Sequence, residues 1–325
     1  MTAVSRRSLD DLASANVAHL PTMYDLPSED PEELGLPDLF HDIQPHLLSR
    51  TLRLEPHHGE DWLTASDLNL YYDPNHTLRH KRPDWVLVLG VPFLYKGPGW
   101  ATKGINPEGD GHQSYVMWHE KVAPTLVVEL LSEGTDGEDL GPFKPAPKRI
   151  RTPKPLSAKA KAKLKAKPPR KFEVYEQILK IPHYIVYDAS TKVLLYFRLI
   201  NGRYSPQTIA PTAPHLWIPE LNLGLGLWTG TFDRMDQTWL RWCDAQGNWI
   251  ATDTEAAKAE AEAAKVEAEA AKAEADRQRQ AKAQATQQLQ QVAQTLLDRG
   301  LSPVEVSSIT GLTEMAIAQL NRPNP

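Results

Sequence analysis

A carboxylate stands inside the most apolar segment of the sequence. Glu129 lies in the run PTLVVELLSEG (124–134), which is typical of a buried strand. Strand alternation places Glu129 on the same face as Val127 and Leu131. A charge buried in this way is unfavourable unless another group neutralises it. The sequence around Glu129 must therefore supply a partner.

Asp84 and Lys171 are the candidates for that partnership. Asp84 follows Pro83 at the start of a second predicted strand, PDWVLVLGV (83–91). If the two strands are neighbours, Asp84 and Glu129 meet at one end of the sheet. A divalent cation such as Mg²⁺ or Mn²⁺ would stabilise both carboxylates and could activate a water as a nucleophile. Lys171, at the start of a predicted helix, could orient that water or stabilise a pentacovalent phosphate.

Each of these residues also has a simpler structural interpretation. Asp84 after a proline is a common turn residue, and Glu129 could form a buried ion pair or lie at a sheet edge. Lys171 could be one more solvated charge at the end of a basic segment, and Tyr175 is expected to pack the helix. Six histidines show no metal-ligand spacing and are interpreted as surface or satisfied residues: His41, His46, His57, His58, His76 and His80.

The elements that must position these residues predict an α/β fold. Strands are expected at 83–91, 114–120 and 124–132, a helix at 170–181, and strands at 182–190 and 193–206, the last turning at Asn201-Gly202. This order indicates a sheet with one helix crossing over it. Upstream, 39–54 predicts a short helix whose start is limited by Pro45, and 63–73 predicts one strand. The tryptophans of 216–252 are expected to cover one sheet edge.

Composition divides the chain into four parts. Residues 1–35 are polar and predict a flexible lead-in, and 36–253 predict the globular domain. Residues 254–298 predict an Ala/Glu/Lys-rich helix or weak coiled coil, and 299–325 a small helical segment. In that segment Ser302, Pro303 and Glu305 form a helix-capping pattern. Because it is acidic, the terminal helix pair favours a packing or protein-binding role over base recognition.

Charge is distributed unevenly along the chain. The net charge is −5, yet twelve Lys or Arg and no Asp or Glu lie between Lys144 and Lys171. The remainder carries 24 basic against 41 acidic residues. The basic insert 141–170 is interpreted either as a loop without a partner or as a contact for phosphates.

Other features narrow the class of protein. Cys243 is the single cysteine, so an intramolecular disulfide is impossible, as is typical of a cytoplasmic protein. We expect no signal peptide, because the first residues lack an apolar segment, and no membrane span, because no apolar run approaches about 18 residues.

Around Asp84, Glu129 and Lys171 the sequence resembles the Uma-two-like restriction endonuclease family of the PD-(D/E)XK nuclease superfamily. The resemblance rests on PD at 83–84, VVELLS at 127–132 and the spaced pattern from Lys171 to Asp188, and extends from about Pro21 to Thr252. It implies a restriction-endonuclease-like mixed sheet core with flanking helices. It also implies that Asp84 and Glu129 are metal ligands, with the Leu130 carbonyl as a third.

The sequence departs from the superfamily pattern at two points. The superfamily lysine would stand two residues after the glutamate, where this chain has Leu131. Lys171 is then the natural substitute, supplied from the helix. In addition, the stretch between Ser132 and Lys171 is long, because it contains the basic insert.

The predicted function is a Mg²⁺- or Mn²⁺-dependent endonuclease that hydrolyses DNA phosphodiesters through Asp84, Glu129 and Lys171. The alternatives are a catalytically inactive nucleic-acid- or protein-binding module on the same fold, and a scaffold that acts through its C-terminal helix. A homodimer would suit cleavage of both strands, and its main interface is expected on the globular domain or on the terminal helix pair. The helix 255–276 is expected to contribute little to it, because alanine buries little area.

Overall fold

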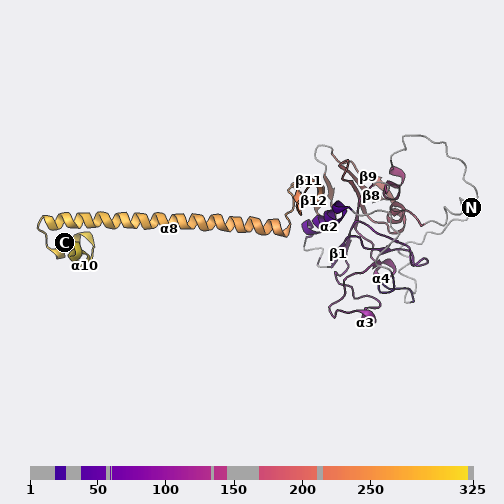
Figure 1. The fold of residues 1–325 in the computed structure, drawn as a ribbon, viewed down its shortest axis with the longest axis horizontal. Coiled ribbons are helices and arrows are strands. Elements are labelled where there is room, and N and C mark those ends of the chain that lie inside the picture. The colour runs from indigo at the N-terminus through magenta and orange to yellow at the C-terminus, as the bar shows by residue number, and fades with distance from the viewer. Residues whose placement is uncertain are drawn as a thin grey trace, which may run out of the picture. The chain divides into compact units, whose positions relative to one another are not determined.

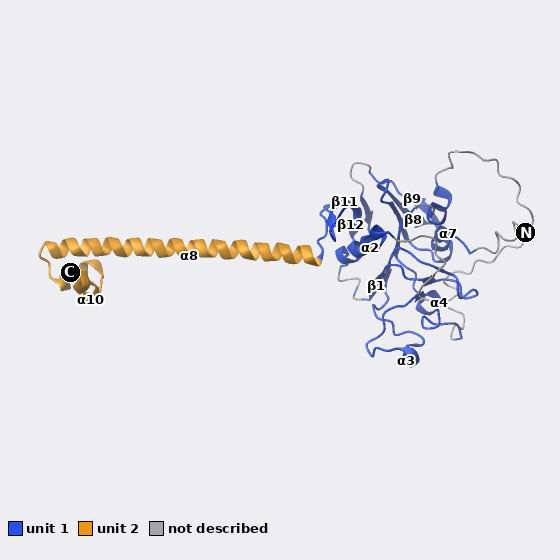
Figure 2. Ribbon diagram, viewed as in Figure 1, with its two compact units in different colours: residues 1–252 blue, residues 253–325 orange. Residues whose placement is uncertain are grey.

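The computed structural model describes residues 19–26, 38–55, 59, 61–132, 135–144, 168–210 and 215–320. It divides the chain into two compact units, residues 1–252 and 253–325 (Figure 2). Most of the basic insert, residues 145–167, lies outside the described residues, as does Arg322 in the terminal segment. No helix within the described ranges is long and apolar enough to cross a membrane.

Unit 1 is built around a six-stranded mixed sheet with the strand order β1-β4-β6-β7-β8-β9. The two outer strands of this sheet, β1 and β9, are labelled in Figure 1. β6 and β7 are parallel and the other neighbours are antiparallel. The strands are β1 (Trp62–Ala65), β4 (Trp85–Leu89), β6 (Leu126–Leu130), β7 (His183–Asp188), β8 (Val193–Ile200) and β9 (Arg203–Pro206). The predicted α/β order is confirmed, including the turn at Asn201-Gly202 between β8 and β9.

The connection between the parallel strands β6 and β7 contains the predicted crossover helix. It begins as α7 (Lys171–Glu173) and continues as a π-helical turn, η3 (Val174–Ile178). The π-turn is visible in the bond from the Leu179 N–H to the Val174 carbonyl, 2.9 Å, which spans five residues. The helix was predicted from apolar periodicity, but a local widening of this kind leaves no such signal.

Both faces of the sheet are covered, because the strands alternate their side chains between two cores. One core joins Val128 and Leu130 of β6 to the helix α2 (Leu39–Thr51) and to the strands of a second sheet. The other core joins Val127 of β6 to Phe172 and Tyr175 of the crossover. The predicted alternation of β6 is therefore confirmed.

α2 was predicted within 39–54, and it begins at Leu39 without the limit that Pro45 was expected to set. Asp38 caps the helix by accepting a hydrogen bond from the His41 N–H, 3.0 Å, so the helix begins before Pro45 rather than near it. Pro45 lies inside the helix, and Gln44 beside it bonds both to the Leu240 carbonyl, 2.9 Å, and the Leu240 N–H, 2.8 Å. These bonds attach α2 to the second sheet.

The second sheet corrects the expectation that the tryptophans of 216–252 cover a sheet edge. It consists of β10 (His215–Ile218), β11 (Leu223–Phe232) and β12 (Met235–Cys243), all antiparallel. Trp239 and Trp242 are fully buried in the core that this sheet shares with α2 and the large sheet. These two tryptophans are core residues, and their burial removes a large apolar area from water.

Two predicted strands are shorter than expected. Residues 63–73 divide into β1 and the two-residue β2 (Leu70–Tyr71), because Asp67 adopts a positive φ that ends the first strand. In 114–120 only β5 (Tyr115–Val116) is extended, and α4 (Met117–Glu120) follows. β2, β3 (His80–Lys81) and β5 form a small third sheet. The remaining short elements are α3 (Trp100–Lys103), α5 (Asp136–Asp139) and η2 (Gly141–Phe143).

Part of the predicted flexible lead-in packs on unit 1. Met23 and Leu26 are buried beside Tyr71 and Trp118. The Trp118 indole donates a hydrogen bond of 3.0 Å to the Pro21 carbonyl. Residues 19–26 therefore contribute to a small core of their own, which polar composition did not indicate.

Unit 2 begins with the long helix α8 (Asp253–Asp298), as the alanine-rich composition predicted. Two short helices follow, α9 (Pro303–Thr310) and α10 (Glu314–Leu320). The predicted cap is present, since the Ser302 hydroxyl and the Glu305 carboxylate each bond the other's backbone N–H. Ala293, Val306 and Ile317 form the buried centre of this small unit.

Candidate active site

The strand register brings Asp84 and Glu129 together at one end of the large sheet. Trp85 of β4 lies opposite Val128 of β6, and the next antiparallel position sets Asp84 opposite Glu129. Both side chains therefore point to the same face, which is the face that the crossover helix covers. The predicted encounter of the two carboxylates is present.

Glu129 has two hydrogen-bond partners, and both come from the crossover. The Lys171 ammonium donates to Glu129 Oε2 at 3.0 Å, and the Tyr175 hydroxyl donates to Oε1 at 2.7 Å. The Glu129 side chain is 1% exposed and that of Lys171 is 18% exposed. Lys171 is thus an enclosed charge in an ion pair with Glu129 and not a solvated end of the basic insert.

The start of the crossover is held in place by a neighbouring acidic residue. The Lys171 backbone N–H donates to Glu138 Oε2 at 3.2 Å, and the Lys81 ammonium reaches the same oxygen at 3.2 Å. Glu138 therefore satisfies a free N–H at the helix start and links it to the small third sheet. These bonds fix the backbone from which the Lys171 side chain reaches Glu129.

Asp84 and Leu130 complete the end of the strand pair. The Leu130 N–H donates to Asp84 Oδ2 at 2.5 Å, so a side chain replaces the next backbone partner of the ladder. The Leu130 carbonyl points to the same side of β6 as its N–H, and it accepts a hydrogen bond from His41 Nε2 at 3.1 Å. His41 comes from the first turn of α2, so elements from both faces of the sheet meet here.

The partners of His41 favour its protonated form. Its Nδ1 lies 2.8 Å from Asp38 Oδ1, and its Nε2 faces the Leu130 carbonyl at 3.1 Å; an imidazolium can donate a hydrogen bond to both of these oxygens. Burial lowers the pKa of His41, but the bond to Asp38 and the charge of Asp84 outweigh it and raise the pKa. Two basic side chains therefore approach this end of the sheet, Lys171 at Glu129 and His41 at the Leu130 carbonyl.

The carboxylates at this end of the sheet are poorly solvated. Burial and the charge of Asp84 raise the pKa of Glu129 to about 8, against the opposing effect of Lys171. Burial likewise raises the pKa of Asp84. Burial would lower the pKa of Lys171, but the charges of Glu129, Asp84 and Asp139 raise it, so its ammonium form is stabilised. Burial thus favours the protonated forms of these carboxyl groups, and a further cation beside them would favour their ionised forms.

Asp139 is the third carboxylate of this environment. It ends α5, is 2% exposed, and its Oδ1 has no hydrogen-bond partner. Burial and the charge of Glu129 raise its pKa to about 7. An incompletely satisfied buried carboxylate beside Lys171 increases the demand for positive charge.

The donor atoms at the site fit a hard divalent cation. The carboxylates of Asp84 and Glu129 and the carbonyl of Leu130 are all oxygen donors at one strand end, and the excess of buried carboxylates favours a cation there. A carboxylate oxygen that accepts one hydrogen bond keeps a second lone pair for a metal. Across the described residues, no group of three or more His, Cys, Asp or Glu side chains forms a ready-made metal cluster. A cation here would therefore need the backbone carbonyl and water as further ligands.

Sequence reasoning identified Asp84, Glu129, Lys171 and Leu130, and the structure brings all four together. It missed the Tyr175 hydroxyl, which was assigned to packing, although Tyr175 lies one helical turn after Lys171 on the same face. It also missed His41, because its contact with Leu130 spans 89 residues and leaves no spacing signal.

The chain is similar to known proteins over most of unit 1. The family model Uma2, described as "Putative restriction endonuclease", matches residues 18–233. Among solved structures, the chain is similar to a putative nuclease belonging to DUF820 from Anabaena variabilis. That likeness has 12% sequence identity and a TM-score of 0.32, and covers 66% of this chain and 90% of that chain. No curated protein matches the chain.

Proposed function

The chain belongs to the Uma2 family of putative restriction endonucleases and has a restriction-endonuclease-like fold, and we propose that its unit 1 is a metal-dependent endonuclease that hydrolyses DNA phosphodiester bonds. The observation that supports this proposal best is the enclosed constellation of Asp84, Glu129 and Lys171. Opposed carboxylates at a strand end with a lysine beside them are suited to hydrolysis of a phosphodiester.

The metal would be held by the carboxylates of Asp84 and Glu129 and by the Leu130 carbonyl. A bound Mg²⁺ or Mn²⁺ supplies Lewis acidity toward a phosphate oxygen and lowers the pKa of a water. Tyr175 fixes the orientation of Glu129 through the bond to Oε1, so that the carboxylate is preorganised before any ligand arrives.

Lys171 and His41 would act on the nucleophile and the phosphate. The Lys171 ammonium lies beside Glu129, where it can orient an attacking water and balance negative charge that develops on the phosphorus oxygens. Asp38 holds the His41 ring so that Nε2 points at the Leu130 carbonyl. In its protonated form, His41 would attract a phosphate that binds near this end of β6. Asp38 would then be a positioning residue.

One observation favours an alternative function, a binding module without catalysis. Both Glu129 oxygens already accept hydrogen bonds, and Leu131 stands where the superfamily lysine is expected. If the ion pair with Lys171 is as strong as its burial suggests, a metal cannot compete and the same surface would bind DNA or protein unchanged.

A plasmid assay separates the two functions. Supercoiled DNA is incubated with Mg²⁺ or Mn²⁺ and with the wild-type protein, Glu129→Gln, or the matched control Glu120→Gln, which alters another largely buried glutamate in unit 1. Nicking by the wild type and the control that is lost in Glu129→Gln supports the endonuclease. Intact plasmid in all three samples, with DNA binding retained, supports the binding module.

A further inference from the structure

Helix α8 exposes an unpartnered surface along most of its length. The helix has 46 residues, and every residue from 256 to 292 is exposed in the single chain. Over this stretch α8 therefore has its whole surface open to a second helix, whereas further along it Ala293 is buried against α9 and α10.

The sequence of α8 contains a seven-residue repeat whose seam is small or apolar except at Gln278 and Lys282. If Ala261 is assigned to position a, position d falls at Ala264, and the repeat continues without interruption to Leu296. The a and d positions are Ala261, Ala264, Ala268, Ala271, Ala275, Gln278, Lys282, Ala285, Leu289, Val292 and Leu296. Val266 lies at an outward position and is not part of the seam.

Charges flank this seam in a regular order. Position g is glutamate in three successive heptads, and the e position five residues later is basic each time. The three g and e combinations are Glu260 with Lys265, Glu267 with Lys272, and Glu274 with Arg279. In a parallel pair of helices, each g residue faces the e residue of the partner five positions further on, so every contact joins opposite charges.

We propose that α8 forms a parallel two-stranded coiled coil with a second copy of this chain. An antiparallel pair would place g against g and e against e, which joins glutamate to glutamate and lysine to lysine. Charge complementarity therefore selects both the partner, an identical helix, and its parallel orientation. Lys282 at an a position restricts the register, as single polar residues in such seams do.

The apolar anchor of this pair lies near the end of α8. Leu289 is 41% and Val292 is 49% exposed, and they occupy successive a and d positions. The terminal helices α9 and α10 pack against Ala293, Leu296 and Leu297, so they leave the side chains of Leu289 and Val292 uncovered. The alanine heptads set orientation through their charged flanks, whereas these two side chains supply most of the apolar contact.

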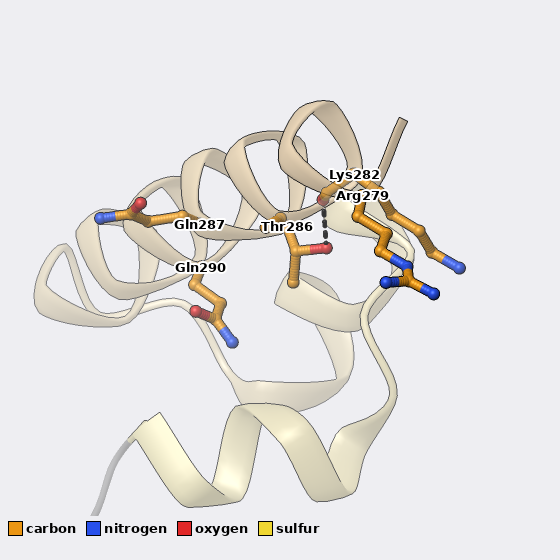
Figure 3. A pocket seen from close by; sticks show the side chains of 6 residues that line it. Arg279, Lys282, Thr286, Gln287 and Gln290 are labelled. Atoms are coloured by element: carbon orange, nitrogen blue, oxygen red, sulfur yellow. Dashed lines mark hydrogen bonds between the residues drawn. The ribbon is translucent and has the colours of Figure 1, made fainter. Parts of the chain in front are cut away.

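A hollow on α8 belongs to the charged part of this association, because it includes Arg279 of an e position and Lys282 of an a position. It is lined by Arg279, Lys282, Thr286, Gln287 and Gln290 together with Ala283, and the labelled side chains are all polar (Figure 3). The Thr286 hydroxyl is turned back onto the Lys282 carbonyl, 2.9 Å away. A polar surface of this kind does not compete with Leu289 and Val292 for an apolar partner.

Cysteine cross-linking of the full chain tests the geometry. Ala268→Cys places a thiol at an a position, and Ala270→Cys places one two residues away on the outer face as the matched control. The natural Cys243 is buried in unit 1, so the unaltered chain serves as the blank. Under mild oxidation, Ala268→Cys is expected to form a disulfide-linked dimer, and Ala270→Cys is expected to form none, although its chains still associate. Equal cross-linking of the two variants, or none in either, would overturn the proposal.

Charge reversal tests the orientation independently. Changing Glu260, Glu267 and Glu274 to Lys is expected to weaken self-association by about tenfold or more in sedimentation equilibrium, because all e and g contacts become repulsive. Changing Lys265, Lys272 and Arg279 to Glu in the same chain restores opposite charges and is expected to restore the dimer. A dimer that is unaffected by the first set, or not recovered by the second, contradicts the parallel coiled coil. A wild-type chain that stays monomeric at high concentration contradicts it as well.

Discussion

Replacing Lys171 with methionine is expected to destabilise unit 1 strongly. Methionine has a similar length but no charge, so the substitution leaves Glu129 buried at 1% exposure without its cation. Asp84 and Asp139 lose the same neutralising charge. Removing one member of a buried ion pair costs about 3–5 kcal/mol. For a unit of this size, that loss lowers the melting temperature by about 6–20 °C.

The structure also predicts an asymmetry between the two members of the pair. Glu129→Gln keeps the shape of the side chain, and Lys171 then still faces Asp84 and Asp139. We therefore expect Glu129→Gln to lower the free energy of unfolding by less than about half of the loss that Lys171→Met causes. The double variant removes both charges and is expected to recover about 2 kcal/mol relative to the sum of the single variants.

Divalent cations supply the decisive comparison. If the site accepts a cation, millimolar Mg²⁺ or Mn²⁺ should raise the melting temperature of Lys171→Met more than that of the wild type, since the metal replaces the missing charge. Asp84→Asn combined with Lys171→Met should lose this rescue. The assay is thermal and urea unfolding followed by tryptophan fluorescence, because Trp85, Trp239 and Trp242 are buried in unit 1.

Two results would refute this reasoning. The first is a Lys171→Met variant within about 1 kcal/mol of the wild type, which would mean that the ion pair is not buried as described. The second is a Glu129→Gln variant that costs more than Lys171→Met, which would mean that the carboxylate excess around Lys171 is absent.

Three further predictions concern single contacts. Tyr175→Phe removes the hydroxyl at 2.7 Å from Glu129 and should cost about 1.5–3 kcal/mol in urea unfolding; an unchanged midpoint would exclude the bond. Gln44→Ala should cost about 2–4 kcal/mol, because it leaves two backbone groups of β12 unpaired; a loss below about 1 kcal/mol would contradict this. Burial raises the pKa of Glu120 to about 7, above its value in the unfolded chain, so its contribution to stability is present at acidic pH and is lost as pH rises toward and through 7. In Glu120→Gln, the decrease in the free energy of unfolding between about pH 4.5 and 8 should therefore be smaller by about 3 kcal/mol. The exposed control Glu108→Gln should keep the wild-type pH profile. Parallel profiles for the wild type and Glu120→Gln would refute this prediction.

Much of the fold follows from local sequence signals. The apolar runs of β4, β6 and β7 and the periodicity of the crossover predicted the order of strands and helix along the chain, because such patterns report which faces are buried. The caps of α9 and the turn at Asn201-Gly202 were equally local. These features need no knowledge of distant parts of the chain.

The misses share a different cause. The second sheet buries Trp239 and Trp242 against α2 and the large sheet, and the sequence contains no local record of which sheet a tryptophan will meet. Residues 114–120 combine a short strand with a helical turn, because Lys121 adopts a positive φ and ends α4 after four residues. Tertiary packing decides such segments, since their intrinsic preferences are weak.

At the site, the charged residues in unusual sequence positions could be predicted from the sequence. Asp84, Glu129 and Lys171 could be found because a charge in an apolar strand or beside a helix start is unusual. His41 could not, since a histidine four residues before Pro45 looks like any surface histidine until the strand end of β6 is placed beside it. Asp139 was missed for the same reason, as its burial depends on the crossover.

We propose that Asp84 and Glu129 hold a divalent cation. Mn²⁺ binding measured by electron paramagnetic resonance tests this proposal most directly. Wild-type protein should remove free Mn²⁺ from solution, and Mg²⁺ should displace it. Asp84→Ala combined with Glu129→Ala should abolish this binding, whereas Glu108→Ala combined with Glu262→Ala, two exposed carboxylates elsewhere, should leave it unchanged. Tight Mn²⁺ binding that survives in the Asp84 and Glu129 double variant would contradict the account.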